Sequence, residues 1–137
     1  MYKTIKIFAI SLFLLLPAAS FAQEQTKEEA DREKKFRENI EKMVENYETS
    51  LNLEYWQVFY VDSILTHDFT AMSEELKKLG DSKVENSDIY QSVSDRWMEQ
   101  IYNSFRKVFN DEQWAKYLKT GAARSKKARD KRQENKK

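Results

Sequence analysis

The chain has 137 residues, 24 basic and 23 acidic, with one histidine and no cysteine. The absence of cysteine excludes a disulfide framework and cysteine-based metal sites. The balanced charge argues against a nucleic-acid-binding protein, because phosphate binding normally requires a clear basic excess.

Residues 1–22 are typical of a secretory signal peptide. Lys3 and Lys6 precede a largely apolar run over residues 7–16, and Ser20–Ala22 places small residues at −3 and −1 of a cut before Gln23. The alternative is a membrane anchor, but this run is about half of the roughly 20 residues that a spanning helix needs. We therefore expect export and cleavage before Gln23.

The remainder of the chain has an all-helical composition. It keeps two glycines, Gly80 and Gly121, and it has no proline, since Pro17 lies within the signal. Glu, Lys, Leu, Gln and Arg are abundant, and all of them favour helices. The length after the cut fits one small domain. We expect an all-α fold without any cofactor or metal.

Apolar spacing predicts four helices, over about 25–49, 53–79, 83–108 and 111–120. Tight connections between them favour antiparallel neighbours. Thr26–Glu29 forms a capping box near the first predicted start, and Gly80 is expected to be the left-handed residue after the second helix. Two starts, at Ser82 and at Asp88, are open for the third helix.

The second predicted helix is apolar on nearly all sides between residues 53 and 61. This segment therefore either packs between two helices or faces a partner, which suggests a homodimer. The candidate client- or partner-binding residues here are Tyr55, Trp56, Phe59 and Tyr60. For the three tryptophans, Trp56, Trp97 and Trp114, a place in the core and a place on a binding surface both stay open.

Charge is unevenly distributed. Residues 38–75 contain nine acids and one base, Lys42, whereas residues 116–137 contain ten bases and two acids. The acidic part is either a solvated surface or a face that the basic tail meets. The basic tail, 121–137, is helical or disordered, and it either frays in solvent or meets an acidic partner, anionic lipid or the protein's own acidic face.

Residues for catalysis or metal binding are few. His67 has Ser63 four residues earlier and Asp68 beside it, but adjacent residues point about 100° apart on a helix, which disfavours a triad. We expect His67 to be partly buried in a helical seam. One histidine without cysteine does not make a metal site, and we expect no enzyme activity.

A motif begins where the third predicted helix ends. Val108-Phe109-Asn110-Asp111-Glu112-Gln113-Trp114 resembles the LTxxQ motif of the Spy/CpxP-like periplasmic proteins. Leu51–Gln57 resembles the earlier copy in that family, with Leu53 and Gln57 at its Leu and Gln positions. In this motif the Thr position caps a helix, and Gln closes a capping box three residues later.

Both copies depart from the family pattern. At the later copy Phe109 replaces Leu and Asn110 replaces Thr. Each can take the role of the residue that it replaces, the apolar contact and the helix cap. At the earlier copy Glu54 stands at the Thr position, where glutamate is a poor cap, and Asn52 is the alternative cap.

The resemblance implies a thin, cradle-like helical homodimer in the periplasm. It implies an ATP-independent chaperone or envelope-stress-response protein that holds unfolded exported clients. The alternative is a helical adaptor that modulates an envelope sensor or another exported protein. A third possibility is a surface-associating protein whose residues 121–137 contact anionic membrane. No nucleic-acid partner is expected.

Overall fold

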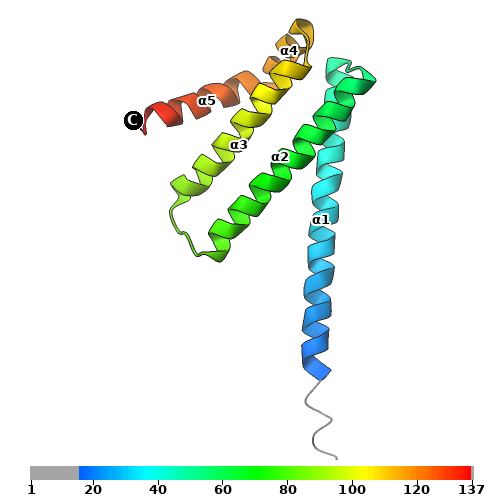
Figure 1. Ribbon diagram of the computed structural model, residues 1–137, viewed down its shortest axis with the longest axis vertical. Helices are drawn as coiled ribbons and strands as arrows, with labels where there is room; N and C mark the ends of the chain where they lie inside the picture. The colour runs from blue at the N-terminus through cyan, green and yellow to red at the C-terminus, as the bar shows by residue number, and fades with distance from the viewer. Residues whose placement is uncertain (1–15, 137) are drawn as a thin grey trace, which may run out of the picture. The chain divides into compact units, whose positions relative to one another are not determined.

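The structure, a computed structural model, describes residues 16–136, with side chains from Glu24 onward. It is helical apart from short connections, with no strand among these residues, so the predicted all-α class is confirmed (Figure 1). Its elements are α1 (Leu16–Leu51), α2 (Tyr55–Asp81), α3 (Ser87–Val108), α4 (Asp111–Tyr117), a π-helical segment η1 (Leu118–Ala122) and α5 (Ala123–Glu134).

The chain divides after Glu38 into two units. In the first, the described residues of α1 are exposed apart from the half-buried Phe36, and Lys34 pairs with Glu38 at 3.9 Å. Since α1 begins at Leu16, the capping box at Thr26–Glu29 lies inside a helix, and the start predicted there is wrong. Most of the predicted signal peptide, residues 1–15, lies outside the described residues.

The second unit begins with the last turns of α1 and its connection to α2. Asn52 has a φ of +51°, and the Leu53 amide donates to the Glu48 carbonyl at 3.1 Å, which terminates α1 with a left-handed residue. The N-cap residue of α2 is Glu54. Asn52 therefore ends one helix rather than capping the next, contrary to the alternative considered from the sequence.

α2 and α3 lie side by side and run in opposite directions (Figure 1). Contacts between them pair Gln57 with Val108, Asp68 with Gln100 and Glu75 with Arg96, in opposite chain order. These pairs fix the register of the hairpin.

The loop between α2 and α3 differs from the prediction. Gly80 lies within α2, and the left-handed residue is Lys83, with a φ of +55°. Asn86 caps α3 by accepting from the Asp88 amide at 2.9 Å, so neither predicted start was correct. Asn86 is an equally good capping residue that lies between the two predicted starts.

The core of the second unit is assembled from α1, α2, α3 and α4, with Phe109 between the last two. Its buried apolar residues are Ile40, Val44 and Leu51 of α1, Val61 and Leu65 of α2, Val93, Ile101 and Phe105 of α3, and Phe109 and Tyr117. Tyr47, Phe105, Phe109 and Tyr117 form a ring cluster with centroids 5.1–5.8 Å apart. Burial raises the pKa values of Tyr47 and Tyr117.

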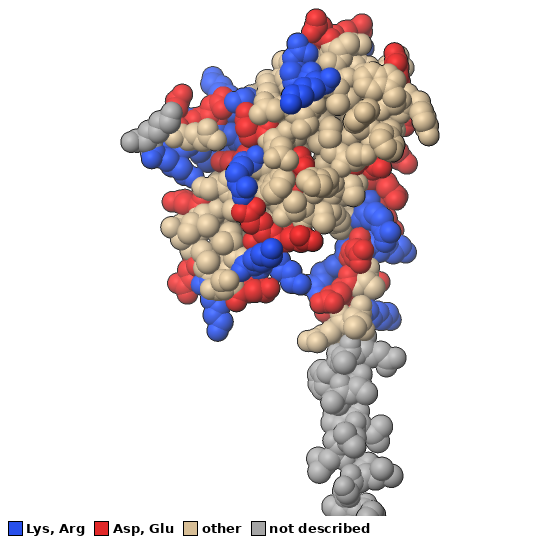
Figure 2. All heavy atoms as spheres, in the orientation of Figure 1, with Lys and Arg blue, Asp and Glu red and all other residues tan. Residues whose placement is uncertain are grey.

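The basic tail is helical and docks on α3. Gly121, with a φ of +104°, supplies the left-handed residue between α4 and α5. Arg132 then forms a bidentate pair with Asp95, with both distances 2.7 Å, and Arg129 and Lys126 bind Glu99 at 3.2 and 3.1 Å. Figure 2 shows acidic and basic residues intermixed where α5 lies.

Candidate functional site

The two motif copies meet through their glutamines. Gln57 Nε2 donates to Gln113 Oε1 at 2.7 Å, and Gln113 Nε2 donates to Gln57 Oε1 at 2.9 Å. Both side chains are buried, at 3 % and 6 % exposure. A closed pair of buried amides links two helix starts that are 56 residues apart in sequence.

Each glutamine also closes its own helix start. Gln57 Oε1 accepts from the Glu54 amide at 2.9 Å, and Gln113 Oε1 accepts from the Asn110 amide at 3.0 Å. Asn110 Oδ1 accepts from the Gln113 amide at 2.8 Å, which completes the capping box predicted at the later copy.

The remaining donors of the pair reach the backbone. Gln57 Nε2 also donates to the Val108 carbonyl at 2.9 Å, and Gln113 Nε2 reaches the Asn52 carbonyl at 3.4 Å. The pair therefore joins the α1–α2 turn to the α3–α4 turn. Because its polar groups are satisfied in a buried setting, it fixes the position of the first turn of α2.

The apolar positions of the two motifs differ in burial. Phe109 is buried against Phe105 and Tyr117, with ring centroids at 5.1 and 5.6 Å. Leu53, at the earlier copy, is half-buried.

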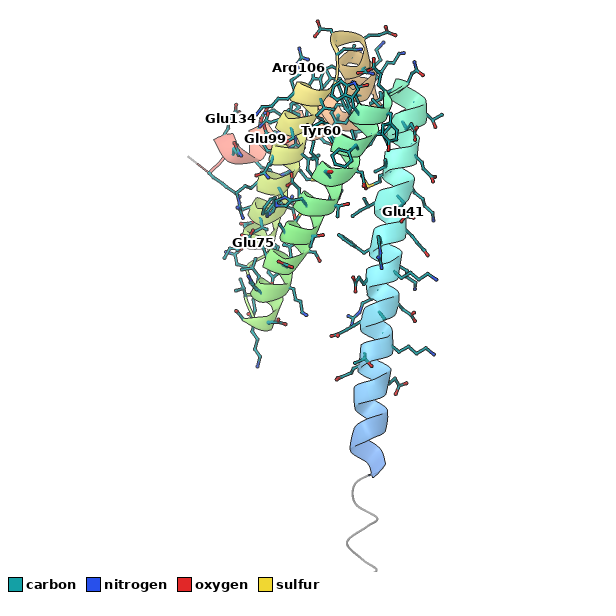
Figure 3. The ribbon with its side chains drawn as sticks, turned by 45° about the vertical axis from the view of Figure 1, so that its right-hand side comes forward. Glu41, Tyr60, Glu75, Glu99, Arg106 and Glu134 are labelled. Atoms are coloured by element: carbon teal, nitrogen blue, oxygen red, sulfur yellow. The ribbon has the colours of Figure 1, made fainter. Side chains whose placement is uncertain are left out.

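The four candidate binding residues on α2 are exposed together. Tyr55, Trp56, Phe59 and Tyr60, here called the aromatic patch, have exposures of 92, 48, 65 and 51 %. Tyr60 contacts Trp56 and Phe59 edge to face, with centroids at 6.1 and 5.8 Å. Tyr60 is labelled on α2 in Figure 3. Exposed apolar groups concentrated in this way are typical of an interaction surface.

Acidic groups border the aromatic patch. Glu54 Oε2 accepts from the Trp56 indole nitrogen at 2.6 Å. Asp62 is exposed, and it follows Phe59 by three residues on the same side of the helix. The role of Glu54 as an indole acceptor was not expected from the sequence, because a glutamate two residues before a tryptophan has no distinctive pattern.

The other two tryptophans lie between helices. Trp97 is half-buried and donates from its indole nitrogen to Glu75 at 2.9 Å. Trp114 is half-buried and packs on Tyr102 with centroids 4.9 Å apart, while the Arg106 guanidinium lies 5.4 Å from its ring. Trp56 alone of the three is exposed.

His67 does not occupy a seam. Its side chain is 74 % exposed, and Nδ1 lies 2.7 Å from the buried Asp68, which also accepts from Gln100 at 3.0 Å. The expectations of a partly buried histidine and of poor geometry toward Asp68 were both wrong, because a carboxylate on the neighbouring residue can turn back along the helix. In the described part of the chain, no cluster of His, Asp and Glu could hold a metal ion.

Comparisons with known proteins give no further assignment: no family model, curated protein or solved structure matches this chain. Among residues 16–136, no helix is long and apolar enough to cross a membrane.

Proposed function

We propose that this protein is an exported, ATP-independent chaperone that holds unfolded polypeptides on the aromatic patch. The observation that carries the proposal is the exposure of Tyr55, Trp56, Phe59 and Tyr60 on the first two turns of α2. A surface of this kind suits extended apolar segments, which an unfolded chain offers in many sequences.

The size of the patch favours weak and reversible contacts. Covering an apolar patch of common size, about 400 Å², yields on the order of 10 kcal/mol at about 25 cal/mol per Å². An association cost of roughly 4–15 kcal/mol is of the same order as this gain. Clients held by so small a surplus exchange readily and can fold between binding events.

The family and the compartment belong to the same proposal. A Spy/CpxP-like protein of the periplasm is supported by the two motif-like segments, whose glutamines close capping boxes and bind each other. N-terminal sequencing of the protein recovered from the periplasm of an expressing Gram-negative cell tests export, and Gln23 should be its first residue.

We retain a homodimer as part of the proposal. A client and a second copy are the two candidate occupants of the aromatic patch. Sedimentation velocity of the Tyr55→Ser/Phe59→Ser variant distinguishes a client-binding patch from a dimer interface. A variant that sediments like the wild type but loses client binding assigns the patch to the client.

Weak contact with anionic membrane is also retained for residues 121–137. Arg124, Lys127 and Lys131 are exposed on the side of α5 away from α3, and no ion pair engages them in the described structure. Each base near an anionic surface contributes about 1 kcal/mol. Replacing all three by glutamine should therefore abolish cosedimentation with anionic vesicles at low salt.

Light scattering of several reduced or heated clients, without nucleotide, tests the chaperone activity. The wild type should delay aggregation at near-stoichiometric ratio, and Tyr55→Ser/Phe59→Ser should not. Ile89→Ser is the matched control, because Ile89 is also an exposed apolar residue but lies on α3. One tight partner in a pull-down, with no effect on aggregation, would instead establish the adaptor.

A further inference from the structure

We propose that the aromatic patch selects extended segments in which basic and apolar residues alternate. This inference rests on the proposed function, and it adds the chemical class of the client. It depends on the spacing of the four rings, on the charges around them, and on the like charges that a second copy would bring.

The rings form two short rows along α2. Tyr55 and Phe59 are four residues apart, as are Trp56 and Tyr60, so the members of each row are separated by about 6 Å along the helix axis. Side chains on one side of an extended chain repeat every two residues, at about 6.6–6.8 Å. An extended segment that lies along α2 therefore meets both rings of a row with successive same-side residues.

The charges around the rows favour a basic client. Glu54 lies at the N-terminal end of the aromatic patch, and Asp62 follows the patch along α2. Residues 38–75 contain nine acids and a single base. Ring faces attract cations, and Arg in particular binds Trp and Tyr faces. Acidic neighbours concentrate basic segments near the surface and repel acidic ones.

The same charges argue against a second copy as the occupant. A two-fold contact brings the same surface of each protomer together. Glu54 and Asp62 would then face the same acids of the partner across the rings, with no base in the first turns of α2 to neutralise them. A basic client segment removes this repulsion.

Two fluorescent peptides of equal length test the selection, one alternating Phe and Arg and the other alternating Phe and Glu. At low salt, the Phe-Arg peptide should bind the full chain at least about 10-fold more tightly than the Phe-Glu peptide. This ratio of affinities should fall with added salt, because the screening length shortens to about 3 Å at 1 M. The double variant Glu54→Gln/Asp62→Asn removes both charges and should reduce this ratio severalfold. Glutamine at position 54 still offers an oxygen to the Trp56 indole, so the variant tests the charge. Glu74→Gln, which removes an exposed charge farther along α2, should leave it unchanged.

A block peptide of the same Phe-Arg composition, with the two residue types segregated, isolates the effect of alternation and should bind severalfold more weakly. Equal binding of the Phe-Arg and Phe-Glu peptides, both lost in Tyr55→Ser/Phe59→Ser, would overturn the charge selection and leave the chaperone proposal standing. Failure of both peptides, together with no suppression of aggregation, would overturn the proposed function itself. If the wild type binds neither peptide and the Tyr55→Ser/Phe59→Ser variant becomes monomeric, the patch would be assigned to a second copy. This result would also overturn the inference.

Discussion

The side-chain amides of Gln57 and Gln113 donate to each other, at 2.7 and 2.9 Å, across the starts of α2 and α4. Each glutamine also accepts from the backbone amide of the residue that caps its own helix. A local capping device is thereby also a tertiary contact. The aromatic patch begins directly at this contact, so its position depends on the amide pair.

The amide pair should show strong coupling between its members. Gln57→Ala or Gln113→Ala leaves the other buried amide without its partner, and each should lower the free energy of unfolding by about 1–3 kcal/mol. The double variant should lose less than the sum, by about 0.5–3 kcal/mol. Urea denaturation measures all three, and exposed Gln133→Ala is the control. Strict additivity would contradict a paired arrangement.

The cap of α4 gives a second, more local test. Asn110→Ala removes the acceptor for the Gln113 amide and should cost about 0.5–2 kcal/mol. Asn110→Thr keeps a capping oxygen and should cost little. Thermal unfolding with calorimetry compares the two. Equal loss in both variants would mean that the asparagine is needed for something other than the cap.

The ion pairs of α5 should differ in how much they contribute to its docking on α3. Arg132→Met leaves the buried carboxylate of Asp95 without its bidentate partner, and α5 should detach from α3. Arg129→Met should perturb α5 less, because Glu99 keeps Lys126 and because Arg129 Nη2 is buried without a hydrogen-bond partner in the described structure. In Figure 3, Glu99 lies on α3 beside α5.

Spin labelling measures this detachment cleanly, since the chain has no cysteine of its own. A label at Ala128→Cys should become mobile in Arg132→Met and remain restricted in Arg129→Met. A label at Ala115→Cys on α4 is the control and should not respond. Equal mobility at Ala128 in both variants would contradict the ranking.

Docking of α5 should also depend on pH. The hydrogen bond from Arg132 is the largest cause that holds the pKa of Asp95 below its ordinary value, while burial opposes it. A lowered folded-state pKa gives stabilisation that is complete above the unfolded-state value of about 3.9 and is lost as the pH falls through the folded-state value. The Ala128→Cys label should therefore remain restricted from neutral pH to about pH 4 and become mobile below it. In Asp95→Asn, its mobility should not change across this range.

Sequence reasoning succeeded where the signal was local. The helices follow from composition and spacing, and the capping box at Asn110 and Gln113 follows from residue types three positions apart. At the start of α2, apolar residues on nearly every side indicated either packing between two helices or a surface that faces a partner, and Tyr55 and Phe59 are exposed.

The long-range pairings could not be predicted in the same way. Each glutamine has a sufficient local role in its own box, so nothing in the spacing requires Gln57 to meet Gln113. The docking of α5 depends on Arg132 reaching Asp95, 37 residues away. An Arg- and Lys-rich segment without large apolar residues looks identical whether it frays or pairs.

Unfolded clients are expected to bind at the start of α2. Photo-crosslinking from benzoylphenylalanine placed at Phe59 tests it most directly, with the same group at exposed Ile89 of α3 as the control. We predict client adducts from position 59, few from position 89, and competition by the Phe-Arg peptide. Equal client adducts at both positions, or adducts at position 59 only with a second copy of this chain, would contradict the account.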